Sequence, residues 1–124
     1  MHPQVLKNIR GHLLELSVPE LQMLRWNNLS PVVSSYTELM CGFEDCDLVG
    51  LVKTELADIP QYQELRTALD SLLVSLRTYE DVVGDRPDAE IVTDKGWLEI
   101  TLLAKRVLHL WDVSEIETDE RLHR

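Results

Sequence analysis

Residues 61–83 read QYQELRTALDSLLVSLRTYEDVV and carry the strongest structural signal in the chain. Large apolar residues recur there in alternating steps of three and four, which is the spacing of one face of an α-helix. The members of this seam are Tyr62, Leu65, Leu69, Leu72, Leu76, Tyr79 and Val83. Ala68 and Leu73 widen the seam, which indicates several neighbouring helices rather than one coiled-coil partner. The stretch therefore predicts a central core helix.

Further helices are predicted on both sides of this stretch. Their expected limits are 3–16, 19–26, 31–40, 48–59 and 95–113. The expected caps are Ser17 with Glu20 at capping-box spacing, Ser30 before Pro31, Asp45 or Asp47, and Thr93 or Asp94. Five glycines and five prolines are too few turn residues for an all-β chain. We expect an all-α, compact single-domain bundle of five or six helices over residues 1–113, followed by a charged, frayed C-terminal tail over residues 114–124.

The last predicted helix has a wide apolar surface. Its expected core face consists of Trp97, Ile100, Ala104, Val107, Leu108 and Trp111. Leu102, Leu103 and Leu110 add a second apolar flank. Such breadth indicates burial between other helices.

The charge of the chain is strongly negative and unevenly distributed. The formal net charge is −10, and residues 1–43 hold three acids and three bases, so the whole excess lies after Phe43. A field of this sign repels phosphate backbones, which argues against direct nucleic-acid binding. A basic protein is the complementary partner. The alternative is that the acidity only keeps the protein soluble.

Two cysteines are too few for the disulfide framework of a small secreted domain. No apolar run approaches the ~20 residues needed to cross a bilayer, and no signal peptide opens the sequence. We therefore expect a cytoplasmic protein that does not enter the membrane.

Motifs for metal, cofactor or catalysis are weak. Cys41 and Cys46 are separated by four residues, and only scattered side chains such as His12 could complete a zinc shell. The pair also lacks the two-residue gap of a redox motif. His109 has no identifiable nucleophile or carboxylate partner, and no Glu-x-x-His motif or phosphate-binding glycine loop occurs. The sequence predicts no metal, no cofactor and no enzyme activity.

Acidic residues concentrate at the two ends of the last predicted helix. Residues 80–94 hold six acids against Arg86 alone, within the longest predicted loop, and residues 112–120 hold five acids and no base. An aromatic anchor inside a charged rim is typical of protein interfaces. The expected partner-binding residues are Asp85, Asp88, Glu90, Asp94, Trp97, Asp112 and Glu115. The alternative is that the tryptophans belong to the core and the acids are solvated helix ends.

No family resemblance follows from specific motifs. Small, acidic, helical domains without catalytic residues are typical of bacterial immunity proteins that neutralise a toxin, and also of adaptors and secretion chaperones. Our leading hypothesis is an immunity-type inhibitor that docks electrostatically into the positive cleft of a toxin nuclease. The alternatives are an adaptor or chaperone, a regulatory homo-oligomer or homo-dimer that buries Leu73, Leu102 and Leu110, and a small helical metal-binding protein or enzyme.

Overall fold

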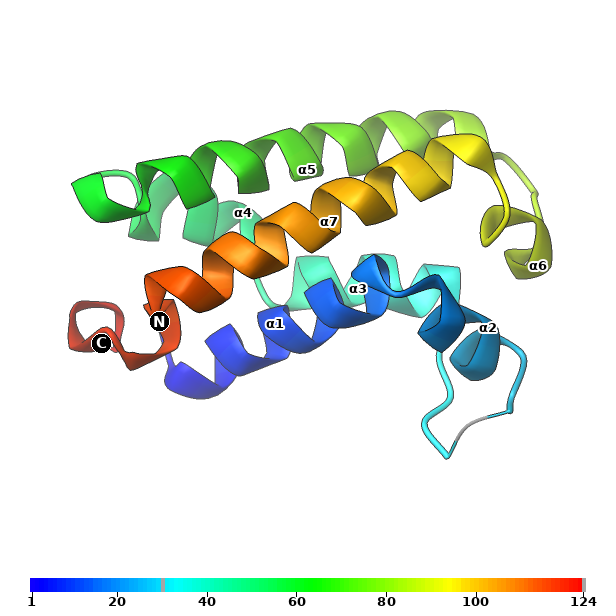
Figure 1. Ribbon diagram of the computed structural model, residues 1–124, viewed down its shortest axis with the longest axis horizontal. Helices are drawn as coiled ribbons and strands as arrows, with labels where there is room; N and C mark the ends of the chain where they lie inside the picture. The colour runs from blue at the N-terminus through cyan, green and yellow to red at the C-terminus, as the bar shows by residue number, and fades with distance from the viewer. Residues whose placement is uncertain (30, 124) are drawn as a thin grey trace.

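The computed structural model describes residues 1–29 and 31–123, and every regular element within them is helical (Figure 1). The longer helices are α1 (Pro3–Ser17), α2 (Pro19–Trp26), α3 (Tyr36–Asp45), α5 (Gln63–Val83) and α7 (Lys95–Ser114). The shorter elements are α4 (Leu48–Gly50), α6 (Asp88–Ile91), a π-helical turn at Leu51–Glu55, and 3-10 turns at Pro60–Tyr62, Ile116–Thr118 and Glu120–Leu122. The prediction of an all-α, single-domain helical bundle is confirmed.

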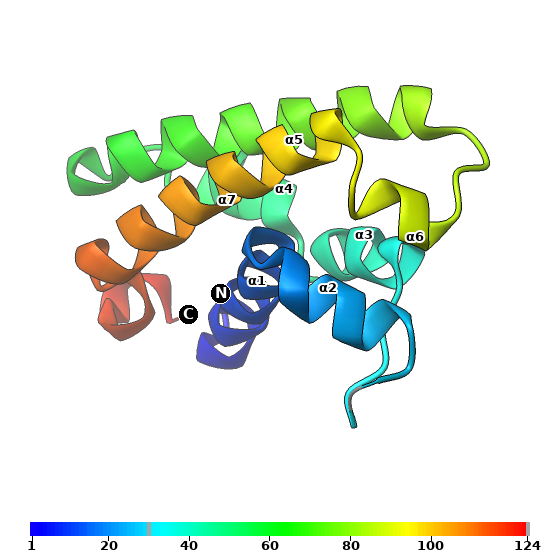
Figure 2. The same ribbon diagram turned by 45° about the vertical axis from the view of Figure 1, so that its right-hand side comes forward.

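The bundle is organised around α7, which packs against α5 on one side and α1 on the other (Figure 1, Figure 2). Helices α2 and α3 both contact α1, and α6 contacts α2. Every member of the predicted α5 seam is buried. On α7 the predicted core face is also buried, except that Leu108 is half-buried, whereas Leu102 on the second flank is 63% exposed. Burial of these apolar faces is the main source of stability.

The third helix begins later than predicted. It starts at Tyr36, and the side chain of Ser35 caps it by accepting a hydrogen bond from the backbone N–H of Glu38. The expected start at Pro31 is wrong: Val32 and Val33 lie before the helix and are more than half exposed. Two adjacent β-branched residues disfavour helix, and Ser35 with Glu38 has the spacing of a capping box. The predicted cap Ser30 lies outside the described residues.

One other helix start differs from its predicted cap, and one predicted helix ends early. Ser17 is the last residue of α1, where its hydroxyl donates to the carbonyl oxygen of Leu14, so Val18 is the N-cap of α2. Asp47 does cap α4 through the N–H of Gly50, but the predicted helix over 48–59 gives way to the π-helical turn after three residues.

The C-terminal segment packs onto the bundle as far as residue 123, whereas a frayed tail was expected over residues 114–124. Residues 116–122 form two 3-10 turns, and Ile116 and Leu122 are at most 1% exposed. The indole N–H of Trp111 donates to Glu117 at 3.0 Å. The amino group of Met1 donates to the carbonyl oxygen of Leu122 at 2.6 Å. Buried apolar side chains and these polar contacts make the segment part of the domain.

A buried polar network joins α1, α2 and α7. The amide nitrogen of Gln22, a fully buried residue, donates to the carbonyl oxygens of Glu15 and Leu16 at the end of α1, both at 3.0 Å. Its amide oxygen accepts from the indole N–H of Trp97 at 2.9 Å. The nearly buried carboxylate of Glu15 pairs with Arg25 at 2.8 Å. These bonds satisfy backbone carbonyls that the end of a helix leaves without intrahelical partners.

No helix in the described part of the chain is long and apolar enough to cross a membrane.

Candidate protein-binding surface

The acidic loop after α5 is held in a defined position. Helix α5 ends at Gly84, which has a positive φ of 59° that favours glycine. The loop that follows contains α6, a helix that was not predicted. Ile91 and Val92 at the end of α6 are buried in the core. The segment over residues 85–92, which we call the α6 end, is therefore attached to the bundle by its own apolar residues.

Three carboxylates project from the α6 end without an internal partner. The side chains of Asp85, Asp88 and Glu90 make no hydrogen bond or ion pair with any described residue. Arg86, the one base in the acidic loop, donates to the carbonyl oxygen of Val82 at 3.2 Å. Together with Glu115 at the far end of α7, these three acids are the predicted partner-binding residues whose carboxylates have no partner among the described residues.

Asp94 has a structural role instead. Its carboxylate accepts a hydrogen bond of 2.7 Å from the hydroxyl of Tyr79 on α5. Burial of Tyr79, together with the nearby Asp94 carboxylate, raises the pKa of the phenol to about 12. Asp94 occupies the N-cap position of α7 but makes no side-chain cap bond there. The residue therefore links α5 to the start of α7.

Trp97, the expected aromatic anchor of the interface, lies in the core, as the alternative interpretation of the tryptophans had it. It is 0% exposed. Its ring lies 5.2 Å from that of Tyr79, 5.4 Å from Tyr36 and 6.1 Å from Trp26, measured between ring centroids. Each of these four aromatic rings comes from a different helix. A side chain that joins four helices cannot reach a partner without unfolding the bundle.

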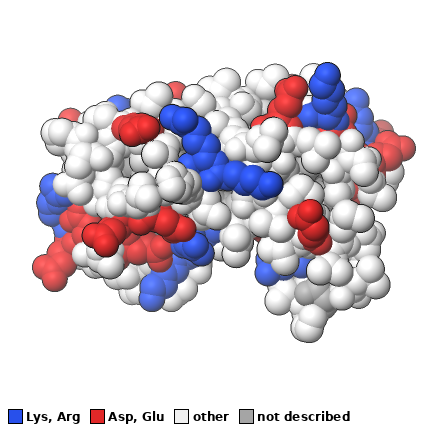
Figure 3. All heavy atoms as spheres, viewed as in Figure 1, with Lys and Arg blue, Asp and Glu red and all other residues white. Residues whose placement is uncertain are grey.

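Asp112 and Glu115 lie at the opposite end of α7. A helix of 20 residues is about 30 Å long, so these acids do not share a surface with the α6 end. Both carboxylate oxygens of Asp112 accept hydrogen bonds from Arg10 on α1, at 2.9 and 3.0 Å. Glu115 is exposed and adopts the left-handed conformation that ends α7. Acidic side chains are visible at both ends of the molecule in Figure 3.

The acids at the C-terminal end are largely neutralised by internal partners. Glu117 accepts from Trp111 and lies 4.0 Å from Arg10. Asp119 accepts from the hydroxyl of Tyr62 at 2.5 Å and pairs with Arg121 at 2.7 Å. These hydrogen bonds from Arg121 and Tyr62 hold the pKa of Asp119 far below its usual range. Three of the five acids in residues 112–120 therefore have internal partners, whereas Asp85, Asp88 and Glu90 of the α6 end have none among the described residues.

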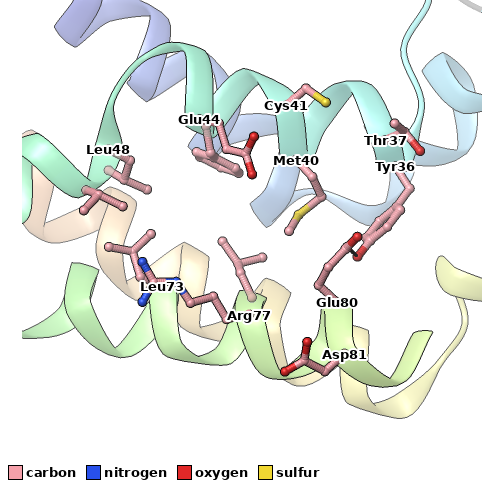
Figure 4. A pocket seen from close by; sticks show the side chains of 13 residues that line it. Tyr36, Thr37, Met40, Cys41, Glu44, Leu48, Leu73, Arg77, Glu80 and Asp81 are labelled. Atoms are coloured by element: carbon pink, nitrogen blue, oxygen red, sulfur yellow. Dashed lines mark hydrogen bonds between the residues drawn. The ribbon is translucent and has the colours of Figure 1, made fainter. Parts of the chain in front are cut away.

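A groove between α3 and α5 was not predicted, and it reaches Glu80 and Asp81 near the end of α5. Its volume is about 440 Å³, and its lining is mostly apolar. Met40 and Leu48 lie across it from Leu73 (Figure 4), and Leu76 also lines it. The groove forms because α3 packs on α1 while α5 packs on α7. The spacing of apolar residues in the sequence does not show which helices stand apart from one another, so it could not predict the groove. Leu73, which widens the α5 seam, is one of the residues that line it.

Charged side chains surround this apolar floor. Glu44 stands on the α3 side, and Arg77, Glu80 and Asp81 stand on the α5 side. The hydroxyl of Tyr36 donates to the carboxylate of Glu80 across one end of the groove. Burial of Tyr36 and this carboxylate raise the pKa of the phenol. The groove thus combines an apolar floor with acids on both walls.

The cysteines do not form a metal or redox site with one another. Cys41 is exposed and lines the groove, whereas Cys46 is buried, and both are free thiols. Burial raises the pKa of the Cys46 thiol, which disfavours the thiolate that binds metals. The ring of His12 packs edge-on against Phe43. Within residues 1–29 and 31–123, no three His, Cys, Asp or Glu side chains come close enough together to hold a metal ion.

Comparisons with models of protein families, with curated proteins and with solved structures find no match to this chain.

Proposed function

We propose that this chain is a small acidic protein-binding module whose α6 end captures a basic protein. One observation carries the proposal: Asp85, Asp88 and Glu90 are presented by a segment that Ile91 and Val92 anchor, and no described residue neutralises them. Fixed charges of one sign raise the association rate with an oppositely charged partner. Binding to a prepositioned surface also avoids the cost of ordering a loop.

The position of these charges gives the proposal further support. The carbonyl end of a helix carries partial negative charge, which disfavours acidic side chains nearby. Helix α5 nevertheless ends with Glu80 and Asp81 in its last turn and Asp85 just beyond, and no base lies in that turn. The arrangement costs stability in the free protein. A basic partner would relieve this repulsion.

The proposed partner class is a toxin nuclease, and the proposed role is that of an immunity-type inhibitor. A nuclease needs a positive cleft to hold phosphates. Carboxylates docked in that cleft would occupy the phosphate positions and block the substrate. Only the charge and placement of the acids support this class.

The test is a capture experiment from the native cell at low and high salt. We expect recovery of a basic protein at low salt, weaker recovery at high salt, and loss of its nuclease activity when the wild-type chain is added. Neutralising the α6 end with Asp85→Asn, Asp88→Asn and Glu90→Gln should slow association about tenfold at low salt. The control carries Asp58→Asn, Glu115→Gln and Glu120→Gln, which change the net charge equally but lie away from the α6 end.

Two results would overturn the proposal. One is that no basic protein is recovered at any salt concentration. The other is that the α6-end variant and the control variant associate at the same rate, because the net charge alone would then account for the attraction.

A homo-oligomer is a second candidate, and exposed apolar residues on α5 and α7 favour it. Val74, Val82 and Leu102 are each more than half exposed. Leu73, which was expected in this interface, is buried within the monomer, and Leu110 is half-buried. Light scattering over a range of concentrations tests this candidate. A mass that remains that of one chain counts against it.

A further inference from the structure

We infer that the groove between α3 and α5 binds a basic amphipathic helix of the partner protein. This inference rests on the proposed function, since it assigns a docking surface to the same basic partner. The apolar floor is lined by Leu48, Leu73 and Leu76, which are at most 8% exposed, and by Met40, which is half-buried and so the most accessible of the four. Glu44 and Asp81 stand on opposite walls (Figure 4).

The shape of the groove suits a helix. Its walls are two helices, α3 and the part of α5 from residue 73 to residue 81. The ten residues of α3 extend over about 15 Å, so three turns of a third helix would fit alongside. An amphipathic helix binds such a groove by laying its apolar face on the floor.

The charges around the groove select a basic helix. Glu44 and Asp81 make no hydrogen bond or ion pair with the described residues, and with Glu80 they place acids on both walls, against one base, Arg77. A helix with lysine or arginine on both sides of its apolar stripe would meet a carboxylate on each wall. A helix flanked by acids would meet repulsion on both. The groove also reaches Glu80 and Asp81 near the end of α5, a few residues before the α6 end begins at Asp85.

The same charges argue against two other occupants. A second copy of the chain carries a net charge of −10, so its approach to an acidic rim is opposed. A membrane surface rich in anionic lipid is opposed for the same reason. A basic segment of another protein remains as the occupant that satisfies both the floor and the rim.

The methionines provide a direct test of where a helix binds. The chain has three methionines: Met40 in the groove, Met23 exposed on α2, and Met1 at the amino terminus. We would label their methyl groups with ¹³C and add a synthetic amphipathic peptide of leucine and lysine. Its controls are the same pattern with glutamate in place of lysine, and a scrambled leucine–lysine peptide that has no apolar face.

The expected result is a shift of the Met40 methyl signal on addition of the amphipathic basic peptide, with Met23 and Met1 unchanged. Fluorescence anisotropy should show that the glutamate peptide and the scrambled peptide bind at least tenfold more weakly. Binding that leaves Met40 unchanged, or that is equal for the scrambled peptide, would overturn the inference.

Matched variants separate the floor from the rim. Met40→Lys places a like charge on the floor and should weaken peptide binding at least tenfold, whereas the control Met23→Lys should leave it within twofold. Glu44→Gln and Asp81→Asn should each weaken binding about 1.5- to 5-fold, the range of exposed ion pairs. These two positions are exposed, so the rim variants test the inference even if Met40→Lys disturbs folding. Unchanged affinity in the rim variants would show that charge does not select the occupant.

The two proposals fail in different ways. If the groove inference is wrong and the proposed function is right, a captured basic protein binds in a salt-dependent manner while the Met40 signal stays unchanged. If the proposed function is wrong, neutralising Asp85, Asp88 and Glu90 has no more effect on capture than the control variant, whatever the peptide does to Met40.

Discussion

Replacing Gln22 by methionine should destabilise the protein far more than an exposed substitution of the same kind. Methionine has a similar length and keeps the site filled, but it removes three hydrogen bonds. The indole N–H of Trp97 and the carbonyl oxygen of Leu16 are then buried without a partner. Each such group costs about 1–3 kcal/mol. The added apolar surface of methionine offsets part of that sum, so we expect a loss of about 2–5 kcal/mol.

A double-mutant cycle identifies the cause of this loss. Trp97→Phe removes the N–H that Gln22→Met leaves unpaired, so the methionine should cost less in the phenylalanine background. The expected coupling energy is about 1–3 kcal/mol. Urea unfolding at pH 7, followed by far-ultraviolet circular dichroism, measures all four proteins without relying on tryptophan fluorescence.

The control is Gln4→Met, since Gln4 is exposed and, among the described residues, its side-chain amide bonds only to the exposed Asn8. It should change the free energy of unfolding by less than about 0.5 kcal/mol. If Gln22→Met is equally mild, the polar network contributes no net stability. If the free-energy losses of Gln22→Met and Trp97→Phe simply add in the double variant, the Gln22–Trp97 hydrogen bond is not the source of the loss.

Three further outcomes are expected. Leu72→Ala should cost about 2–5 kcal/mol in the same assay, because Leu72 is 0% exposed and its truncation leaves a cavity; a change near zero would refute the assignment of the α5 seam to the core. Arg10 lowers the pKa of Asp112 in the folded protein. The pair therefore stabilises the protein fully above the pKa of an unfolded aspartate, about 3.9, and this stabilisation is lost as the pH falls through the pKa of Asp112 in the folded protein. Because the Asp112 side chain is 47% exposed, Asp112→Asn should cost only about 0.2–1 kcal/mol at pH 7, and the cost should vanish in acid. Burial raises the pKa of Tyr62 and Tyr79 to about 12. The stability that these phenols contribute is therefore complete below their unfolded pKa of about 10 and declines as the pH rises toward 12. An ultraviolet titration that finds either phenol ionised near pH 10 in the folded protein would contradict their buried environments.

The fold class was predictable because it depends on local and periodic signals. The α5 seam repeats over 21 residues of helix, and no competing strand pattern is present. Helix starts were less predictable because several residues can act as caps. Ser30 and Ser35 both precede a helical pattern, and the weak helix propensity of Val32 and Val33, the Glu38 at capping-box spacing and the packing of Tyr36 into the aromatic core together favour Ser35.

The candidate site was predictable only in part, since the sequence does not show which charges find internal partners. Arg10 and Asp112 are 102 positions apart, yet they form a bidentate pair. Asp94 likewise pairs with Tyr79 on another helix. Asp85, Asp88 and Glu90 look no different from these acids in the sequence, and their availability follows from the three-dimensional arrangement alone.

The four-ring cluster described above gives the protein a built-in optical reporter. Tyr36 lines the groove, and its ring lies 5.4 Å from that of Trp97. A helix that enters the groove and moves Tyr36 would alter the surroundings of Trp97, and so its fluorescence. Trp111 lies at the far end of α7, beside Glu117. Replacing Trp111 would leave only the emission of Trp26 and Trp97 in the cluster, and replacing both of those would leave only Trp111 at the other end, with no added dye.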